Sequence, residues 1–187
     1  MKFFLSNYKE KIYKSQRPRA VEQLNKTGYR HLMFQDWPSK KDEEWRYTAL
    51  EALKNKELFW QGRPEKELCL NQLNILPIKN KDTIYLFNGH FISGLSDRSF
   101  SKDCGVEIVT PNNINFDIFL NKFSDIAIGP LDILRSMNSA FSDNFLILLF
   151  NETVSERVVK IKNIEIENQQ FMFSTPRILL HLNKGVE

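Results

Sequence analysis

The chain has 187 residues, of which 42% are hydrophobic and 26% are charged, the composition of an ordinary globular protein. This composition excludes collagen, coiled-coil and low-complexity chains, and the length fits one domain, or one domain with an appendage. The 26 basic and 23 acidic residues give a net charge of +3, which argues against nucleic acid as the main partner.

The region before residue 60 predicts helices. Apolar residues recur at helical spacing between Phe3 and Leu24, and Pro18 predicts a break or a restart because it lacks an amide hydrogen. Gly28 follows the last periodic residue and is expected to form the C-cap. A second helix is predicted to begin at Ser39, a suitable N-cap that is followed by acidic residues favourable to the helix dipole.

Basic residues outnumber acidic residues in the first part of the chain. Residues 1–30 contain Glu10 and Glu22 against a larger basic set: Lys2, Lys9, Lys11, Lys14, Arg17, Arg19, Lys26 and Arg30. A solvated helix face is the simpler interpretation of this excess. The alternative is a stand-alone interaction module whose basic N-terminal helices bind RNA or an acidic protein.

The pattern changes to short strands after a connector at residues 61–80, which has room for one short strand. Thr83–Phe87 and His90–Ile92 flank Asn88-Gly89, the strongest short signal for a β-hairpin. Gly105–Val109 predicts a further strand, which Pro111 ends.

One helix is predicted between the strands. Pro130 suits its first position, and Ser142–Asn144 is expected to end it. The residues expected on its apolar face are Leu131, Leu134, Met137 or Asn138, and Phe141.

Short β-forming runs follow this helix, several of them ended by an asparagine that is expected to turn a corner. The runs are Phe145–Phe150, Val158–Ile161 ended by Asn163, Ile164–Ile166, Phe171–Phe173 and Ile178–Leu182. Such a pattern is typical of a sandwich, a barrel or a β-solenoid, and periodicity alone does not choose among them. An open β end near Glu187 would offer an edge for pairing with a second copy in a homodimer.

The sequence offers no catalytic, cofactor-binding or metal-ligating residue. His31, His90 and His181 lie far apart, and neither Cys69 nor Cys104 has the spacing of a zinc site. Nucleotide-binding glycine motifs and a nucleophile elbow do not occur. A carbohydrate-active enzyme would need paired carboxylates on adjacent coils, and it ranks last because the strand runs at 145–150 and 178–182 contain no acidic residue. These residues favour a scaffold or interaction protein over an enzyme.

No apolar run is long enough to span a membrane, and Phe3–Leu5 is too short for the core of a signal peptide. We therefore expect a cytoplasmic protein with reduced thiols and without membrane contact.

Four segments, in order over most of the chain, carry a family resemblance. They are Lys41–Thr48 (KDEEWRYT), Phe87–Phe91 with Leu95-Ser96, Met137–Phe141 (MNSAF) and Thr175–Leu179 (TPRIL). These segments resemble four motifs of the SufB/SufD family of iron–sulfur cluster assembly proteins. The first two resemble its Lys-x-Glu-x-Trp-Arg/Lys-Tyr-Thr signature and its Asn-Gly-x-Phe…Leu-Ser hairpin. The last two resemble its Leu-Asn-x-Ala-Phe helix end and its Pro-Arg strand. The stretch Arg17–Ala20 is similar to the early helix of that family, and the first two segments are closer to its SufD members.

The resemblance implies an α+β fold that is mainly β: an N-terminal helical region and linker in residues 1–80, then the first coils of a right-handed parallel β-helix in residues 81–187. It also implies a scaffold subunit that works with SufB and with SufC, the partner that uses ATP, on a complex that builds iron–sulfur clusters. Family members are much longer, and their functional cysteine and histidine positions lie beyond Glu187. The resemblance therefore implies that this chain is the N-terminal portion of such a subunit, which binds no cofactor and assembles no cluster alone. Cys69 and Cys104 match none of the cluster ligands of the family.

Overall fold

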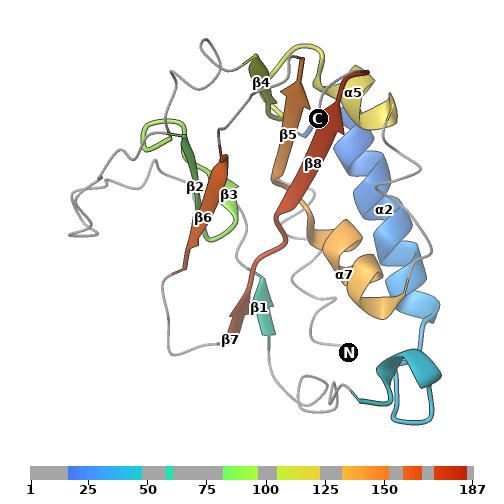
Figure 1. Cartoon of the computed structure of the whole chain (residues 1–187). Coiled ribbons are helices and arrows are strands. Elements are labelled where there is room, and N and C mark those ends of the chain that lie inside the picture. Colours follow the sequence, from blue (N-terminus) through green and yellow to red (C-terminus); the bar gives the residue numbers. More distant parts are fainter. Residues whose placement is uncertain are drawn as a thin grey trace. The chain divides into compact units, whose positions relative to one another are not determined.

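Figure 1 shows the computed structural model of the chain, which describes residues 17–47, 58–60, 82–96, 105–122, 132–151, 158–165 and 171–184. These residues form helices and strands in similar amounts, arranged as three small sheets that do not close within the described part. The fold is therefore a mixed α/β fold and is not plainly mainly β. None of the described helices combines the length and the apolar character needed to cross a bilayer.

The chain divides into two compact units, each assembled from three separate segments. The first comprises Met1–Gly62, Asp117–Asp143 and Asn168–Thr175, and the second comprises Arg63–Phe116, Asn144–Glu167 and Pro176–Glu187. The division at residue 80 expected from the sequence stays a prediction.

The first unit contains two helices in contact, α2 (Arg19–Phe34) and α7 (Ile133–Phe141). α2 begins directly after Pro18, which confirms the predicted restart. The prediction that Gly28 ends this helix is wrong, because α2 continues for six more residues to Phe34. Gly28 is buried where α2 meets α7, and a Cβ atom at this position would lie 2.5 Å from the backbone nitrogen of Ala140. The absence of a side chain therefore serves helix packing rather than capping.

α7 begins at Ile133 with Asp132 as its N-cap, whose side chain accepts a hydrogen bond of 2.8 Å from the Arg135 amide. Pro130, expected at its first position, lies outside the described residues, and so does Leu131. The helix ends at Phe141, as predicted. Its fully buried positions are Ile133, Ser136, Ser139, Ala140 and Phe141, so the predicted apolar stripe is only partly correct: Leu134 and Met137 are half-buried at the margin of the core.

A small core holds this unit together. Leu32 of α2, Ile133, Ala140 and Phe141 of α7, and Trp60 form one buried cluster. Trp60 belongs to β1 (Leu58–Trp60), which pairs in parallel with β7 (Phe171–Phe173). β7 was predicted, whereas β1 was not, because the region before residue 60 was predicted to be helical.

The short helix α5 (Phe116–Lys122) was also not predicted. Its Asp117 carboxylate accepts a 3.1 Å hydrogen bond from the Ala20 amide in the first turn of α2. Because the first amides of a helix have no partner within the helix, Asp117 stabilises the start of α2 from a distant part of the chain.

The second unit contains the predicted hairpin. β2 (Thr83–Phe87) pairs antiparallel with β3 (His90–Phe91), and Asn88 and Gly89 have φ angles of 46° and 81°. Positive φ at both central residues matches a type I′ turn and confirms the prediction from Asn-Gly.

Substituting Gly89 tests this turn. Gly89→Val is expected to lower the free energy of unfolding by about 2 kcal/mol, because a β-branched residue is strained at positive φ. Gly89→Asn is the matched variant and is expected to cost less, since asparagine tolerates this region. Urea unfolding of both variants measures the difference, and equal losses would contradict the role of the turn.

β6 (Lys160–Ile164) pairs in parallel with β2 on the side opposite to β3. The sequence predicted a corner at Asn163 between two shorter strands, and this prediction is wrong. Asn163 lies inside β6, where its side-chain oxygen accepts a 2.9 Å hydrogen bond from the Gly89 amide. An asparagine can therefore continue a strand when its side chain binds a neighbouring turn.

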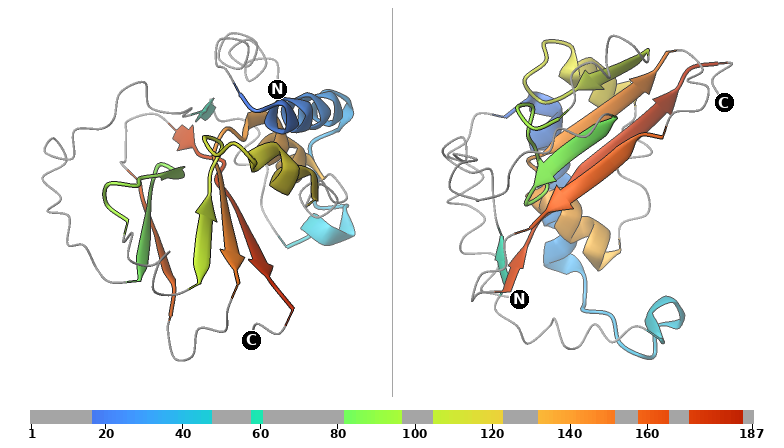
Figure 2. Two further views of the ribbon diagram at one scale, coloured as in Figure 1. Left: turned by 90° about the horizontal axis from the view of Figure 1, so that it is seen from above. Right: turned by 60° about the vertical axis from the view of Figure 1, so that its left-hand side comes forward.

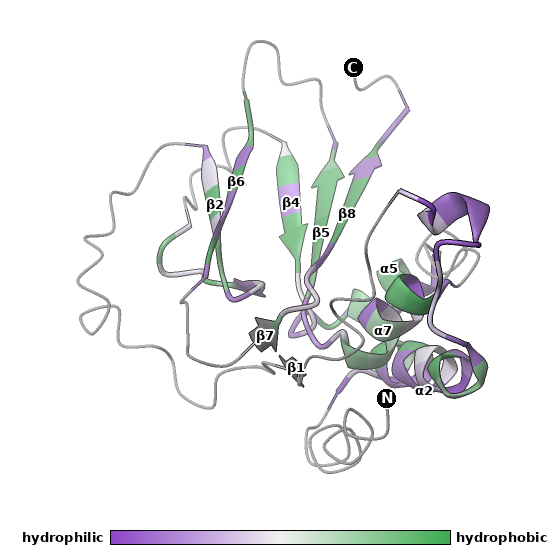
Figure 3. Cartoon of the chain, turned by 90° about the horizontal axis from the view of Figure 1, so that it is seen from below, coloured by the Kyte–Doolittle hydropathy of each residue, from purple (hydrophilic) through white to green (hydrophobic). Residues whose placement is uncertain are grey.

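The other sheet of this unit has the order β4-β5-β8 (Figure 2). β4 (Val106–Val109) pairs antiparallel with β5 (Phe145–Phe150), and β8 (Arg177–Leu182) pairs in parallel with β5. All three strands were predicted. β5 is hydrophobic along its length (Figure 3), and its Leu146 and Leu148 join Ile84, Leu86 and Val106 in one buried cluster.

Candidate functional site

Asn25, in the middle of α2, is fully buried and connects α2 to the end of α7. Its side-chain nitrogen donates to the carbonyl oxygens of Ser139, at 2.9 Å, and Ser142, at 2.7 Å. The last carbonyls of a helix lack partners within the helix, and Asn25 donates to one of them and to the carbonyl of the residue that caps the helix. Sequence reasoning missed Asn25, although a polar residue on the apolar face of a helix is a recognisable signal.

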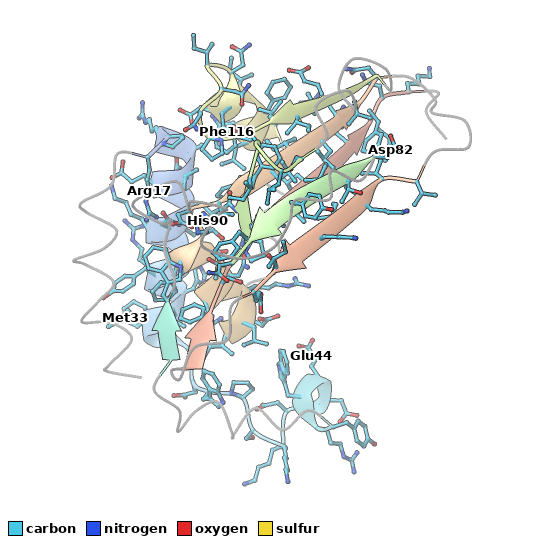
Figure 4. The ribbon with its side chains drawn as sticks, turned by 90° about the vertical axis from the view of Figure 1, so that its left-hand side faces the viewer. Arg17, Met33, Glu44, Asp82, His90 and Phe116 are labelled. Carbon is cyan, nitrogen blue, oxygen red and sulfur yellow. The ribbon has the colours of Figure 1, made fainter. Side chains whose placement is uncertain are left out.

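Arg17 completes this arrangement. Its guanidinium donates a 2.8 Å hydrogen bond to the side-chain oxygen of Asn25, and its central carbon lies 5.6 Å from the centre of a Trp60 ring. In Figure 4, Arg17 lies toward the N-terminal end of α2 and Met33 toward the other end. Trp60 in turn packs on Phe141, with ring centres 5.5 Å apart. Arg17 therefore combines a charge-assisted hydrogen bond with a cation–π contact.

Thr175 reaches the same helix end. Its hydroxyl donates a 3.0 Å hydrogen bond to the carbonyl of Phe141, and the Ser142 hydroxyl donates to the carbonyl of Asn138 at 2.5 Å. Phe173 adds an edge-to-face contact with Phe141, at 5.3 Å between ring centres. Three of the segments that carry the family resemblance, beginning at Arg17, Met137 and Thr175, thus supply residues to one buried junction.

The hairpin segment also contributes to the fold, through Leu95 and Ser96. The Ser96 hydroxyl donates to the carbonyl of Ile92 at 2.8 Å and accepts from the Tyr85 amide at 3.0 Å. Leu95 is buried beside it, with 5% of its surface exposed. The Leu95-Ser96 pair therefore fixes the chain where it leaves the hairpin.

The segment from Lys41 to Tyr47 behaves differently, because its side chains are mostly exposed. The expected α-helix starting at Ser39 is not formed in the described part: only one 3₁₀ turn, η1 (Glu43–Trp45), follows Asp42. The Asp42 carboxylate turns back and accepts a 2.7 Å hydrogen bond from the Ser39 amide, which favours a tight turn. Thr48 lies outside the described residues.

Two aromatic side chains of this region are almost fully exposed. Tyr47 is 91% exposed and Phe34, at the end of α2, is 90% exposed. The Arg46 guanidinium lies 5.7 Å from the Tyr47 ring centre, while Glu43 and Glu44 add exposed carboxylates. Figure 4 labels Glu44 at this turn. We call Asp42–Tyr47 the aromatic loop surface. Exposed aromatic side chains beside charges are typical of protein-interaction surfaces.

The titratable groups do not form a reaction centre in the described ranges. Of the three histidines, His90 is buried in the hairpin, and His181 Nε2 lies 3.0 Å from the side-chain oxygen of Asn183. No three histidine, cysteine or acidic side chains of the described residues come close enough to hold a metal ion. Cys69 and Cys104 lie outside those residues, and the absence of a bound cofactor stays a prediction.

Two charged groups have shifted pKa values. The hydrogen bond and charge of Lys26, whose ammonium lies 2.6 Å from Glu22, hold the pKa of Glu22 below its usual value. Burial lowers the pKa of Arg177 to about 10, and its guanidinium lies 6.0 Å from the Phe145 ring centre. Arg177, the first residue of β8, therefore stays charged at neutral pH and makes a cation–π contact with the Phe145 ring of β5.

No protein-family model matches the chain, and no curated protein is significantly similar to it. The family resemblance therefore depends on the quoted segments and on the contacts that their residues make.

Proposed function

We propose that this protein is a non-enzymatic scaffold subunit of a SufD-like iron–sulfur cluster assembly complex, working in the cytoplasm with SufB-like and SufC-like partners. One observation carries this proposal: three successive strands pair in parallel with three earlier strands, each in a different sheet. β6 pairs with β2, β7 with β1, and β8 with β5.

This pairing supports a coil of a parallel β-helix. In such a solenoid the chain passes through successive sheets and stacks each strand on its counterpart in the coil below. β6, β7 and β8 follow this order with short connections. The strands beneath them are less regular, because β1 precedes β2 in the chain. We accordingly propose that β6–β8 form the first regular coil of a right-handed β-helix.

The contacts of the resembling segments give further support. The segments starting at Met137 and Thr175 meet through the Thr175–Phe141 hydrogen bond, so two of the resembling segments lie together in the fold. The aromatic loop surface, in contrast, has exposed side chains that the fold does not require. We propose that it contacts a partner subunit, since a scaffold acts through its surfaces.

Co-expression of the full chain with SufB and SufC tests the proposed function. Affinity purification through a tag on SufB is expected to retain this chain in a fixed ratio, measured by quantitative mass spectrometry. Tyr47→Ala is expected to weaken the retained complex by about tenfold, as for an interface aromatic residue. Ile114→Ala is the matched control, since Ile114 is 99% exposed but lies outside the aromatic loop surface. Complete loss of the chain during washing would contradict the scaffold function.

The RNA-binding alternative receives less support from the described part of the basic region. The exposed face of α2 carries Arg19, Lys26 and Arg30, but Lys26 is paired with Glu22. A steep decrease in RNA affinity with salt, measured by fluorescence anisotropy, would favour this alternative.

A further inference from the structure

The turn of the hairpin contains two residues that can react with each other. Asn88 is followed directly by Gly89, and this pair occurs once in the sequence. The backbone nitrogen that follows an asparagine can attack the carbonyl carbon of the asparagine side chain. Glycine hinders this attack least, because it has no Cβ atom. Asn88 is therefore the asparagine of this chain whose local sequence most favours loss of the side-chain amide.

Two hydrogen bonds connect this pair to β6, the strand beside β2 in Figure 1. The Asn88 amide donates to the carbonyl oxygen of Ile164 at 2.8 Å. The Gly89 amide donates to the side-chain oxygen of Asn163 at 2.9 Å. The backbone nitrogens of both reacting residues are thus held by adjacent residues of one strand that lies far away in the sequence.

The bond to Asn163 involves the attacking atom itself. Before it can attack, the Gly89 nitrogen has to lose its proton and turn toward the side chain of Asn88. Asn163 binds that proton, and a hydrogen bond to the protonated form opposes its loss. Burial acts in the same direction, because Asn88 is only 5% exposed and a negatively charged nitrogen is costly away from water.

The turn is also fixed by the strands on both sides of it. Phe87 pairs with His90 directly before and after the two central residues, whose φ angles are 46° and 81°. These angles close the hairpin, and ring closure between Asn88 and Gly89 requires rotation away from them. The strand pairing therefore opposes the reaction together with the two bonds to β6.

We propose that Asn88 is a deamidation site, and that Asn163 suppresses the reaction for as long as β6 is paired with β2. In this reaction a bond forms between the Gly89 nitrogen and Cγ of Asn88. The bond from Cγ to the side-chain nitrogen breaks, and that nitrogen leaves as ammonia with the proton from Gly89. Water then opens the five-membered ring and leaves aspartate or isoaspartate at this position.

Either product changes a turn that β6 has to bind. Isoaspartate adds one carbon to the main chain, so the turn can no longer present both amides to Asn163 and Ile164 in the same register. Aspartate places a negative charge in a buried turn, which is costly. Asn88 thus converts a temporary loss of β6 pairing into a permanent covalent change.

Peptide mapping of the full chain by mass spectrometry, during incubation in mildly alkaline buffer, tests this proposal, which is independent of the proposed scaffold function. The folded parent chain is expected to deamidate at Asn88 more slowly than the same chain in guanidinium chloride. Asn163→Ala is expected to deamidate there about tenfold faster than the folded parent, the factor that one lost hydrogen bond allows. Circular dichroism checks that the variant is folded.

Glu165→Ala is the matched control. The side chain of Glu165 accepts a 2.8 Å hydrogen bond from the side-chain nitrogen of Asn163, so this variant changes the surroundings of Asn163 but keeps its bond to Gly89. Its deamidation rate at Asn88 is expected to equal that of the parent. Asn138, which precedes Ser139 in α7, is the internal standard for general loosening of the fold.

Three results would overturn the proposal. They are equal rates at Asn88 in the folded and unfolded parent, a parent rate in folded Asn163→Ala, and equal acceleration in Glu165→Ala or at Asn138. If Asn163→Ala does not fold, Asn163→Asp decides in its place. A carboxylate accepts more strongly from the Gly89 amide, so this variant is expected to deamidate no faster than the parent, and a faster rate would also overturn the proposal.

Discussion

Replacing Gly28 with alanine is expected to lower the free energy of unfolding by about 3 kcal/mol, the upper end for overpacking a buried contact. The added Cβ would lie 2.5 Å from the backbone nitrogen of Ala140 and 2.6 Å from the Cβ of Ser139. The first atom is a backbone atom of α7 and the second is bonded directly to its backbone, so neither can move unless α7 shifts. Equilibrium unfolding in urea, followed by circular dichroism, measures the loss.

Gly94→Ala is the matched control for this substitution. A Cβ at Gly94 would meet no atom within 4 Å. We therefore expect a change within about 0.5 kcal/mol, as for most surface substitutions. Similar losses for the two variants would show that α2 and α7 do not approach each other at Gly28.

Asn25→Ala is expected to lower the free energy of unfolding by about 3 kcal/mol, because two buried carbonyls lose their donor. The carbonyl oxygens of Ser139 and Ser142 would then have to bind water or stay without this partner. The Arg17 guanidinium would also lose its acceptor on Asn25, at 2.8 Å. Thermal and urea unfolding measure the effect.

Gln23→Ala provides the comparison for Asn25→Ala, because Gln23 lies on the exposed face of the same helix. Its effect is expected to stay within about 0.5 kcal/mol. If both variants were equally stable, the hydrogen bonds of Asn25 would contribute nothing beyond ordinary helix propensity.

The elements that could be predicted are those whose signals are local. Asn88-Gly89 specifies its turn through the φ angles that the two residues tolerate, so the hairpin was found at the correct residues. Phe145–Phe150 was found because a continuous apolar run predicts a buried strand. The restart of α2 after Pro18 likewise depends only on the chemistry of proline.

Two of the wrong predictions concern residues whose role depends on a distant partner. Gly28 has the local signal of a C-cap, but its contact with Ala140 decides its role. Asn163 has the signal of a corner, but the amide of Gly89 holds it within β6. Local sequence contains no information on such partners, which is also why the parallel pairing of β6, β7 and β8 could not be derived from periodicity.

The candidate site was predictable to a similar extent. The segments beginning at Lys41, Met137 and Thr175 could be recognised in the sequence. Their different roles in the fold could not be predicted from it. Met137 and Thr175 begin segments whose buried residues join at α7, whereas the segment from Lys41 exposes Tyr47. Asn25 was missed because its hydrogen-bond acceptors lie more than a hundred positions away in the chain.

The proposed scaffold function depends most directly on the stacking of β6, β7 and β8 on three earlier strands. Cross-strand nuclear Overhauser effects between backbone protons of the full chain measure this stacking. The predicted result is parallel contacts at Tyr85–Lys162, Phe59–Met172 and Ile147–Leu179, the aligned pairs of the three sheets. An antiparallel pattern at any of these pairs, or pairing of β6 with β8, would contradict the β-helical coil and with it the basis of the proposed function.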